Sequence, residues 1–284
     1  MPTTLDQALT ALADVAGAQV LAGGTDLMVE VNHGHRRPAA VVAVGRIAEL
    51  QGWSRLVDGG VRLGAALTYT ELMAPGLAIL VPALSAAART VGSPQIRNAG
   101  TIGGNVGTAS PAGDTLPVLA ALDAVATVAS VRGRRQVAVS ELIVGPKRTS
   151  LAADELIVDV VVPAAQPGDV QDYLKVGTRN AMVIAVASVA LVCRRAERTV
   201  RVGLGSVGPV PLRAPEAEAF AAEHIDWERG RVTDDGVAGR FGRLVAAAAR
   251  PIDDHRSTAG YRRRAVEVLA ARALRRHLGL RAAA

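Results

Sequence analysis

The chain has 284 residues, of which half are hydrophobic and only 2% aromatic, and its formal net charge is +6. So few aromatic rings argue against nucleic-acid binding by base stacking, and the length exceeds that of a usual single domain. Because Cys193 is the single cysteine, the sequence excludes an intrachain disulfide and an iron–sulfur cluster or structural zinc site ligated by cysteines of this chain alone.

The N-terminal residues lack the basic and apolar regions of a signal peptide. The longest apolar run, Ala181 to Cys193, is too short to cross a bilayer and contains Ser188. We therefore expect no transmembrane segment and a cytoplasmic location. Arginines cluster at residues 262–264 and 275–276, where we expect a solvated helix face rather than a nucleic-acid surface.

The first fifty residues predict a helix, a strand, a glycine turn and a second strand. The helix carries Leu5, Ala8, Leu9 and Leu12 at helical spacing and ends at Gly17. Residues 19–22 form the first expected strand and residues 40–44 the second. Between them, residues 23–25 (Gly-Gly-Thr) place backbone amides and a hydroxyl at one point, as a phosphate oxygen requires. A plain tight turn is the alternative.

From residue 57 the pattern indicates a second, α+β lobe. Gly59-Gly60 is typical of a hairpin, and Thr68 to Leu72 reads as a capped helix start. Further helices are expected over 82–91 and 116–122, and strands over 124–131 and 156–162.

The stretch from Gln95 to Asp114 contains five glycines although apolar segments flank it. Glycine in a buried position usually allows the backbone to approach something closely, so we expect a buried loop beside a ligand. Asp114 has two open interpretations: it accepts hydrogen bonds from a ligand diol, or it caps the helix that follows.

After residue 168 a third unit begins. Strands over 173–176, 181–193 and 200–207 predict a three-stranded antiparallel sheet, and helices over 214–223, 237–249 and 259–278 follow it. Strands followed by helices are typical of an α+β domain.

Together, the two glycine clusters indicate a pyrophosphate bound between the lobes, as in a dinucleotide. The side chains of Asn105, Thr108, Ser110 and Asp114 are candidates to bind its sugar hydroxyls. Neither cluster has the glycine spacing of a Rossmann fold or a P-loop.

Several motifs closely resemble the FAD-binding medium subunit of molybdenum hydroxylases, the family of carbon monoxide dehydrogenase and xanthine dehydrogenase. They are LAGGTDL at 21–27, IRNAGTIGGN at 96–105, ASP at 109–111 with Asp114, GLGSV at 203–207 and RAPEA at 213–217. The resemblance covers nearly the whole chain.

The resemblance implies a two-lobed FAD-binding domain of the vanillyl-alcohol-oxidase (PCMH) type over residues 1–165, with lobes 1–56 and 57–165. A C-terminal domain over 170–284 follows. The resemblance also implies that FAD is bound by Val20, Leu21, Ala22, Gly23, Gly24, Thr25, Asp26, Leu27, Val91, Thr101, Ile102, Gly103, Gly104, Asn105, Asp114, Leu156, Ile157 and Lys175. For Lys175, an exposed strand position without a flavin role is the alternative.

In function, the resemblance implies an electron-transfer subunit. It would take electrons from a small subunit with 2Fe-2S clusters, while a large molybdopterin subunit hydroxylates the substrate, in a dimer of heterotrimers. We expect no catalytic residue and no metal ligand in this chain. Two alternatives are a stand-alone FAD-dependent oxidase of the same fold and a structural subunit whose flavin site is vestigial.

Overall fold

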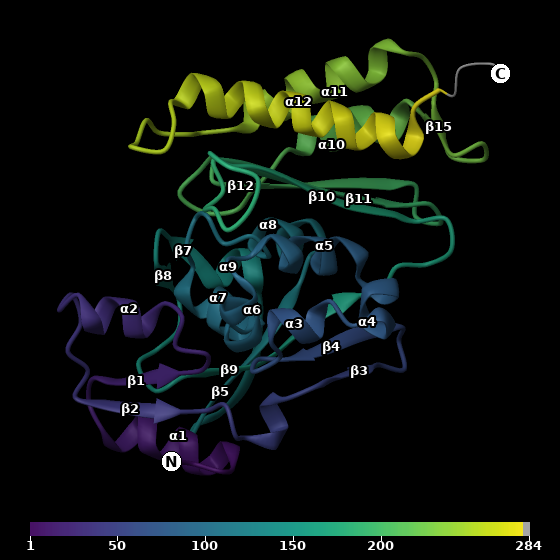
Figure 1. Ribbon diagram of the computed structural model, residues 1–284. Coiled ribbons are helices and arrows are strands. Elements are labelled where there is room, and N and C mark those ends of the chain that lie inside the picture. Colours follow the sequence, from purple (N-terminus) through teal and green to yellow (C-terminus); the bar gives the residue numbers. More distant parts are fainter. Residues whose placement is uncertain (281–284) are drawn as a thin grey trace.

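Three groups of buried apolar side chains organise the fold, which the computed structural model describes for residues 1–280. Figure 1 shows the N-terminal lobe at one end, the second lobe in the middle, and a sheet covered by long helices at the other end. The predicted α+β class is confirmed. Within residues 1–280, no helix has the length and apolar character needed to span a bilayer.

The N-terminal lobe is a small parallel unit. Helix α1 (Leu5–Asp14) buries the four predicted apolar residues and is capped by Thr4. The two predicted strands are confirmed as β1 (Ala18–Leu21) and β2 (Ala40–Ala43), and they pair in parallel. Helix α2 (Leu27–Asn32) lies between them along the chain, so the glycine turn joins the end of β1 to the start of α2.

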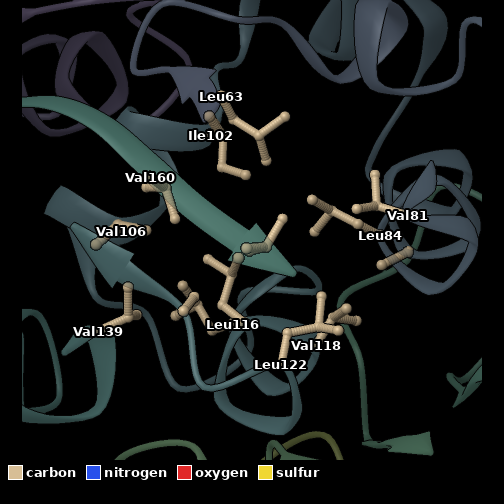
Figure 2. Packing of buried hydrophobic residues seen from close by; sticks show 14 of the residues in the cluster. Leu63, Val81, Leu84, Ile102, Val106, Leu116, Val118, Leu122, Val139 and Val160 are labelled. Atoms are coloured by element: carbon tan, nitrogen blue, oxygen red, sulfur yellow. The ribbon is translucent and has the colours of Figure 1, made fainter. Parts of the chain in front are cut away.

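The second lobe is built on a five-stranded antiparallel sheet in the order β3-β4-β9-β5-β6. Its strands are β3 (Trp53–Arg55), β4 (Gly60–Gly64), β9 (Leu156–Pro163), β5 (Val125–Ser130) and β6 (Gly133–Ala138). The predicted hairpin at Gly59-Gly60 and the two predicted strands are confirmed. Figure 2 shows the core of this lobe, where Leu63 and Val160 from the sheet meet Ile102 and Val106.

Short helices cover this sheet. They are α3 (Tyr69–Leu72), α4 (Pro75–Leu80), α5 (Pro82–Thr90), α6 (Pro94–Ala99), α7 (Ile102–Thr108), α8 (Leu116–Ala121) and α9 (Val139–Leu142), with a two-stranded element of β7 (Ile143–Gly145) and β8 (Arg148–Thr149). The predicted helix start at Thr68 is confirmed, because Thr68 and Glu71 form a reciprocal capping box.

The prediction of a loop over the glycine-rich stretch was wrong, because this stretch contains helices α6 and α7. The hydroxyl of Thr101 accepts a hydrogen bond from the amide of Gly104 and so caps α7. Ile102 and Val106, one turn apart, are both fully buried. Burial of this apolar pair, together with the cap, offsets the low helix propensity of the glycines.

The C-terminal sheet has four antiparallel strands, so the prediction of three was wrong. They are β10 (Val170–Val176), β11 (Ala187–Arg194), β12 (Thr199–Gly205) and the two-residue β13 (Leu212–Arg213). The strand predicted from residue 181 begins only at Ala187. Before it, Met182 has a left-handed backbone (φ +48°), and Arg179 donates a hydrogen bond to the carbonyl of Ala181.

The predicted C-terminal helices are confirmed as α10 (Pro215–Glu223), α11 (Gly236–Ala248) and α12 (Ala259–Leu278), with a short hairpin of β14 (Ile225–Asp226) and β15 (Arg231–Val232). Figure 1 shows the helices on the outer face of the sheet. On its other face the sheet packs on α8, so closely that a Cβ added to Gly203 would lie 1.7 Å from the carbonyl oxygen of Pro117.

Candidate functional site

A cavity of about 390 Å³ lies where the two N-terminal lobes meet. Its wall comes from β1, the glycine turn and α2 on one side, and from α7 and the start of β9 on the other, elements that Figure 1 shows close together. Most of the predicted cofactor residues line it: Val20, Ala22, Gly23, Gly24, Thr25, Asp26, Leu27, Thr101, Gly103, Gly104, Asn105, Thr108, Leu156 and Ile157. Two segments about eighty residues apart in the sequence are thus brought to one site.

The first glycine segment presents unused backbone donors. In the described part of the chain, the amides of residues 23–26 donate no hydrogen bond to the protein. Gly24 has a left-handed backbone (φ +71°), and a Cβ added to Gly23 would lie 1.8 Å from the carbonyl oxygen of Ala99. Gly23 is therefore required by protein packing, and Gly24 by the turn that presents successive amides at the cavity, an arrangement suited to oxyanions.

The second glycine segment has a different role from the one predicted for it. The amides of residues 102–105 already donate within the protein, to the carbonyls of Ala65, Leu67 and Thr101 and to the Thr101 hydroxyl. Around Gly104, however, an added Cβ would meet only the Thr101 hydroxyl at 3.0 Å and the Ala22 methyl at 3.9 Å. This segment contributes a bare surface that a ligand can approach closely, whereas the first segment contributes the donors.

Polar side chains complete this part of the wall. The Asn105 carbonyl oxygen accepts a hydrogen bond from the Thr115 hydroxyl, which leaves the Asn105 amide nitrogen as the group available to a ligand. Thr108 and Asp26 both line this part of the cavity. Burial raises the pKa of Asp26 above its usual value, and the Lys147 ammonium opposes this shift.

The remaining predicted residues do not line the cavity: Leu21, Val91, Ile102, Ser110, Asp114 and Lys175. Asp114 instead accepts hydrogen bonds from the Tyr173 hydroxyl at 2.8 Å and from the Lys175 ammonium at 2.6 Å. Burial raises the pKa of Asp114, while the charge and hydrogen bond of Lys175 oppose the rise. Both side chains of the ion pair are only 7% exposed.

These contacts overturn two of the alternatives. Asp114 is not a helix cap, because α8 begins at Leu116 without a side-chain capping bond. Lys175 is not an exposed strand residue, since its ammonium also donates to the carbonyl of Thr90 at 3.0 Å. The pair joins β10 of the C-terminal sheet to the segment that follows α7.

Apart from Asp26, sequence reasoning missed the charged residues of the cavity. Glu30, Arg36 and Lys147 line it, and Glu155, also in the wall, is paired with Arg135 at 2.8 Å. The sequence Gly-Pro-Lys-Arg at 145–148 indicates a turn at Lys147, but it does not indicate that Lys147 lies beside α2.

No three His, Cys, Asp or Glu side chains gather as metal ligands in residues 1–280. The one thiol, Cys193, is buried in the C-terminal core, and burial raises its pKa to about 12.

Two protein-family models match the chain and together cover most of its length. Residues 1–165 match the family described as "FAD binding domain in molybdopterin dehydrogenase", and residues 172–277 match the "CO dehydrogenase flavoprotein C-terminal domain". The chain belongs to this flavoprotein family. The resemblance inferred from the glycine motifs is thereby confirmed.

Relatives match along most of their length. The chain is 34% identical over 223 residues to the xanthine dehydrogenase FAD-binding subunit of Escherichia coli O157:H7, covering 77% of the chain and 76% of the relative. It is 31% identical over 276 residues to the glyceraldehyde dehydrogenase medium chain of Sulfolobus acidocaldarius, covering 96% and 95%. A carbon monoxide dehydrogenase structure from Hydrogenophaga pseudoflava superposes with a TM-score of 0.88 at 28% identity, covering 96% and 94%.

Proposed function

We propose that the chain is the FAD-binding, electron-transfer subunit of a molybdenum-containing hydroxylase. The observation that carries this proposal is the pairing of unused amides at residues 23–26 with the bare surface at Gly104. A diphosphate needs close backbone donors and room to approach them, and the two segments supply one each. FAD supplies the redox chemistry, and the protein supplies binding, orientation and electrostatics.

The residues of the chain divide this work. The amides of residues 23–26 would hold the diphosphate, and the amide group of Asn105 would serve a hydroxyl. Val20, Leu156 and Ile157 provide an apolar part of the wall. Asp114 and Lys175, which lie beyond this wall, remain candidates for contact with the flavin end.

The relatives support the proposal about partners. They include FAD-binding and medium subunits, such as the nicotine 6-hydroxylase medium subunit of Paenarthrobacter nicotinovorans, which is 34% identical. We place the molybdopterin on a large partner subunit and the 2Fe-2S clusters on a small one, in a dimer of heterotrimers. A cytoplasmic location fits a chain whose single cysteine forms no disulfide.

The test is to express the full chain alone and together with its partner subunits, and to record flavin absorbance in both preparations. We expect FAD in the chain alone, and bleaching by the hydroxylase substrate only in the complex. A chain that takes up no FAD on reconstitution would instead be a structural subunit. Bleaching of the isolated chain by a small alcohol would identify a stand-alone oxidase.

A further inference from the structure

A three-residue ionic cluster sits in the cavity wall and joins the two lobes. The Glu30 carboxylate, on α2, binds the Lys147 ammonium at 2.6 Å through one oxygen and the Arg36 guanidinium at 2.8 Å through the other. Arg36 also donates to the side chain of Gln19 at 2.9 Å. All three charged residues line the cavity, and Lys147 comes from the β7–β8 turn of the second lobe.

The backbone of the β7–β8 turn fixes the position of Lys147. Its φ is +54°, a left-handed conformation that is unfavourable for a residue with a Cβ. Its amide donates to the carbonyl of Ala109, directly after α7, at 2.9 Å. The β7–β8 turn is therefore anchored to the end of α7, the helix that carries the second glycine segment. From this turn the Lys147 side chain reaches Glu30 in the first lobe.

The charges of the cavity make these cations necessary for an anionic ligand. Asp26 and Glu30 both face the cavity, and Lys147 is close enough to affect the pKa of each. A diphosphate beside two carboxylates meets electrostatic repulsion unless cations stand next to it. Lys147 and Arg36 are the cations in the wall, and both are now paired with the single carboxylate of Glu30.

We propose that Lys147 and Arg36 bind the diphosphate of FAD, with Glu30 as the counter-ion that keeps them at the cavity and competes for them. This inference rests on the proposed function. When the diphosphate binds, the Lys147 ammonium moves from the carboxylate of Glu30 to a phosphate oxygen, and the cofactor thereby connects the two lobes. Because Glu30 competes with the diphosphate for Lys147, the Glu30 carboxylate weakens FAD binding, whereas Lys147 strengthens it.

The test is FAD binding by the full chain, followed by flavin fluorescence quenching, for Lys147→Met, Arg36→Met and Glu30→Gln. Arg148→Met and Arg37→Met are matched controls, because these arginines adjoin the cations in sequence, are exposed and do not line the cavity. A lost charge-assisted hydrogen bond predicts a rise in Kd of roughly 10- to 100-fold for K147M. E30Q should lower Kd, and both controls should stay within about twofold of wild type.

Two further measurements tie the effect to the phosphates. The Kd of ADP should rise in K147M, whereas that of adenosine should not. The Kd of FAD should also depend less on salt in K147M than in wild type, because one screened attraction is gone. Melting temperatures of the apoproteins check that every variant is folded.

The outcomes separate the two proposals. If K147M and E30Q weaken FAD binding alike, the ion pair only locks the lobes together and the inference is wrong. It is also wrong if K147M binds FAD like R148M while wild type binds normally. If wild type itself takes up no FAD, both the inference and the proposed function are overturned.

Discussion

Replacing Gly104 by alanine should weaken FAD binding and leave the fold intact. In the protein, the new methyl group would meet only the Thr101 hydroxyl at 3.0 Å and the Ala22 methyl at 3.9 Å. Alanine also gains up to about 1 kcal/mol of helix propensity over glycine, which offsets the tight contact. The methyl group would project where the cofactor approaches, and overpacking of ~1–3 kcal/mol raises Kd roughly 5- to 150-fold.

Gly103→Ala is the matched control on the neighbouring residue. A Cβ there would lie 2.5 Å from the Cβ of Ala65 and 2.7 Å from its carbonyl oxygen, so the protein itself must shift. At ~1–3 kcal/mol of strain, the apoprotein should melt roughly 2–12 °C lower. Differential scanning fluorimetry of both apoproteins and FAD titrations of both variants make the comparison. The reasoning fails if G104A binds FAD within twofold of wild type, or if it melts as low as G103A.

Three further predictions concern charge and packing. Burial raises the pKa of Asp26 above the value of 3.8 that it has in an unfolded chain, so the folded state binds the proton of this carboxyl more tightly. Its contribution to stability is therefore lost as the pH rises from about 3.8 through the raised pKa of the folded state. In Asp26→Asn, melting temperatures measured against pH should lack this fall. Gly203→Ala should lower the melting temperature by several degrees, since its Cβ would lie 1.7 Å from the Pro117 oxygen; an unchanged value would contradict the packing described. Asp114→Ala should destabilise the protein by ~3–5 kcal/mol in urea unfolding, because it leaves the buried Lys175 ammonium unpaired, and the added change Lys175→Met should restore most of the loss.

Local patterns predicted the elements that local forces determine. Apolar residues at helical spacing gave α1, α5 and α12 close to their observed bounds, and Gly59-Gly60 gave the β3–β4 hairpin. The prediction of a strand over residues 181–186 was wrong, because an apolar run does not reveal the turn at Met182. In this turn Arg179 donates hydrogen bonds to the carbonyls of Ala181 and Met182. Strand β13 is two residues long, too short for any periodicity to indicate.

The glycine-rich stretch shows how one signal can obscure another. Five glycines indicated a loop, while Ile102 and Val106 at helical spacing and Thr101 as a cap indicated a helix. The helix forms because both apolar side chains are buried in the core of the second lobe. The expectation of a close approach to a ligand now depends on Gly104, because Gly103 is needed for contact with Ala65.

The charged part of the cavity could not be predicted from the sequence. Glu30 and Lys147 are 117 residues apart and meet only because the β7–β8 turn is bound to the end of α7. Nothing in the local sequence of either residue indicates its partner. The glycine motifs therefore predicted the two backbone segments of the cavity wall, whereas the charged pairs in that wall depend on how the chain folds.

Asp114 links the cavity to the rest of the molecule. Its partners Tyr173 and Lys175 both lie on β10, so the C-terminal sheet is hydrogen-bonded to the segment directly after α7. The same sheet packs through Gly203 against Pro117, three residues further along the chain from Asp114. Two contacts from the C-terminal domain thus fix the segment whose preceding helix carries Gly104. The C-terminal domain therefore helps to hold the segment that follows the helix carrying Gly104, although it adds no residue to the cavity wall.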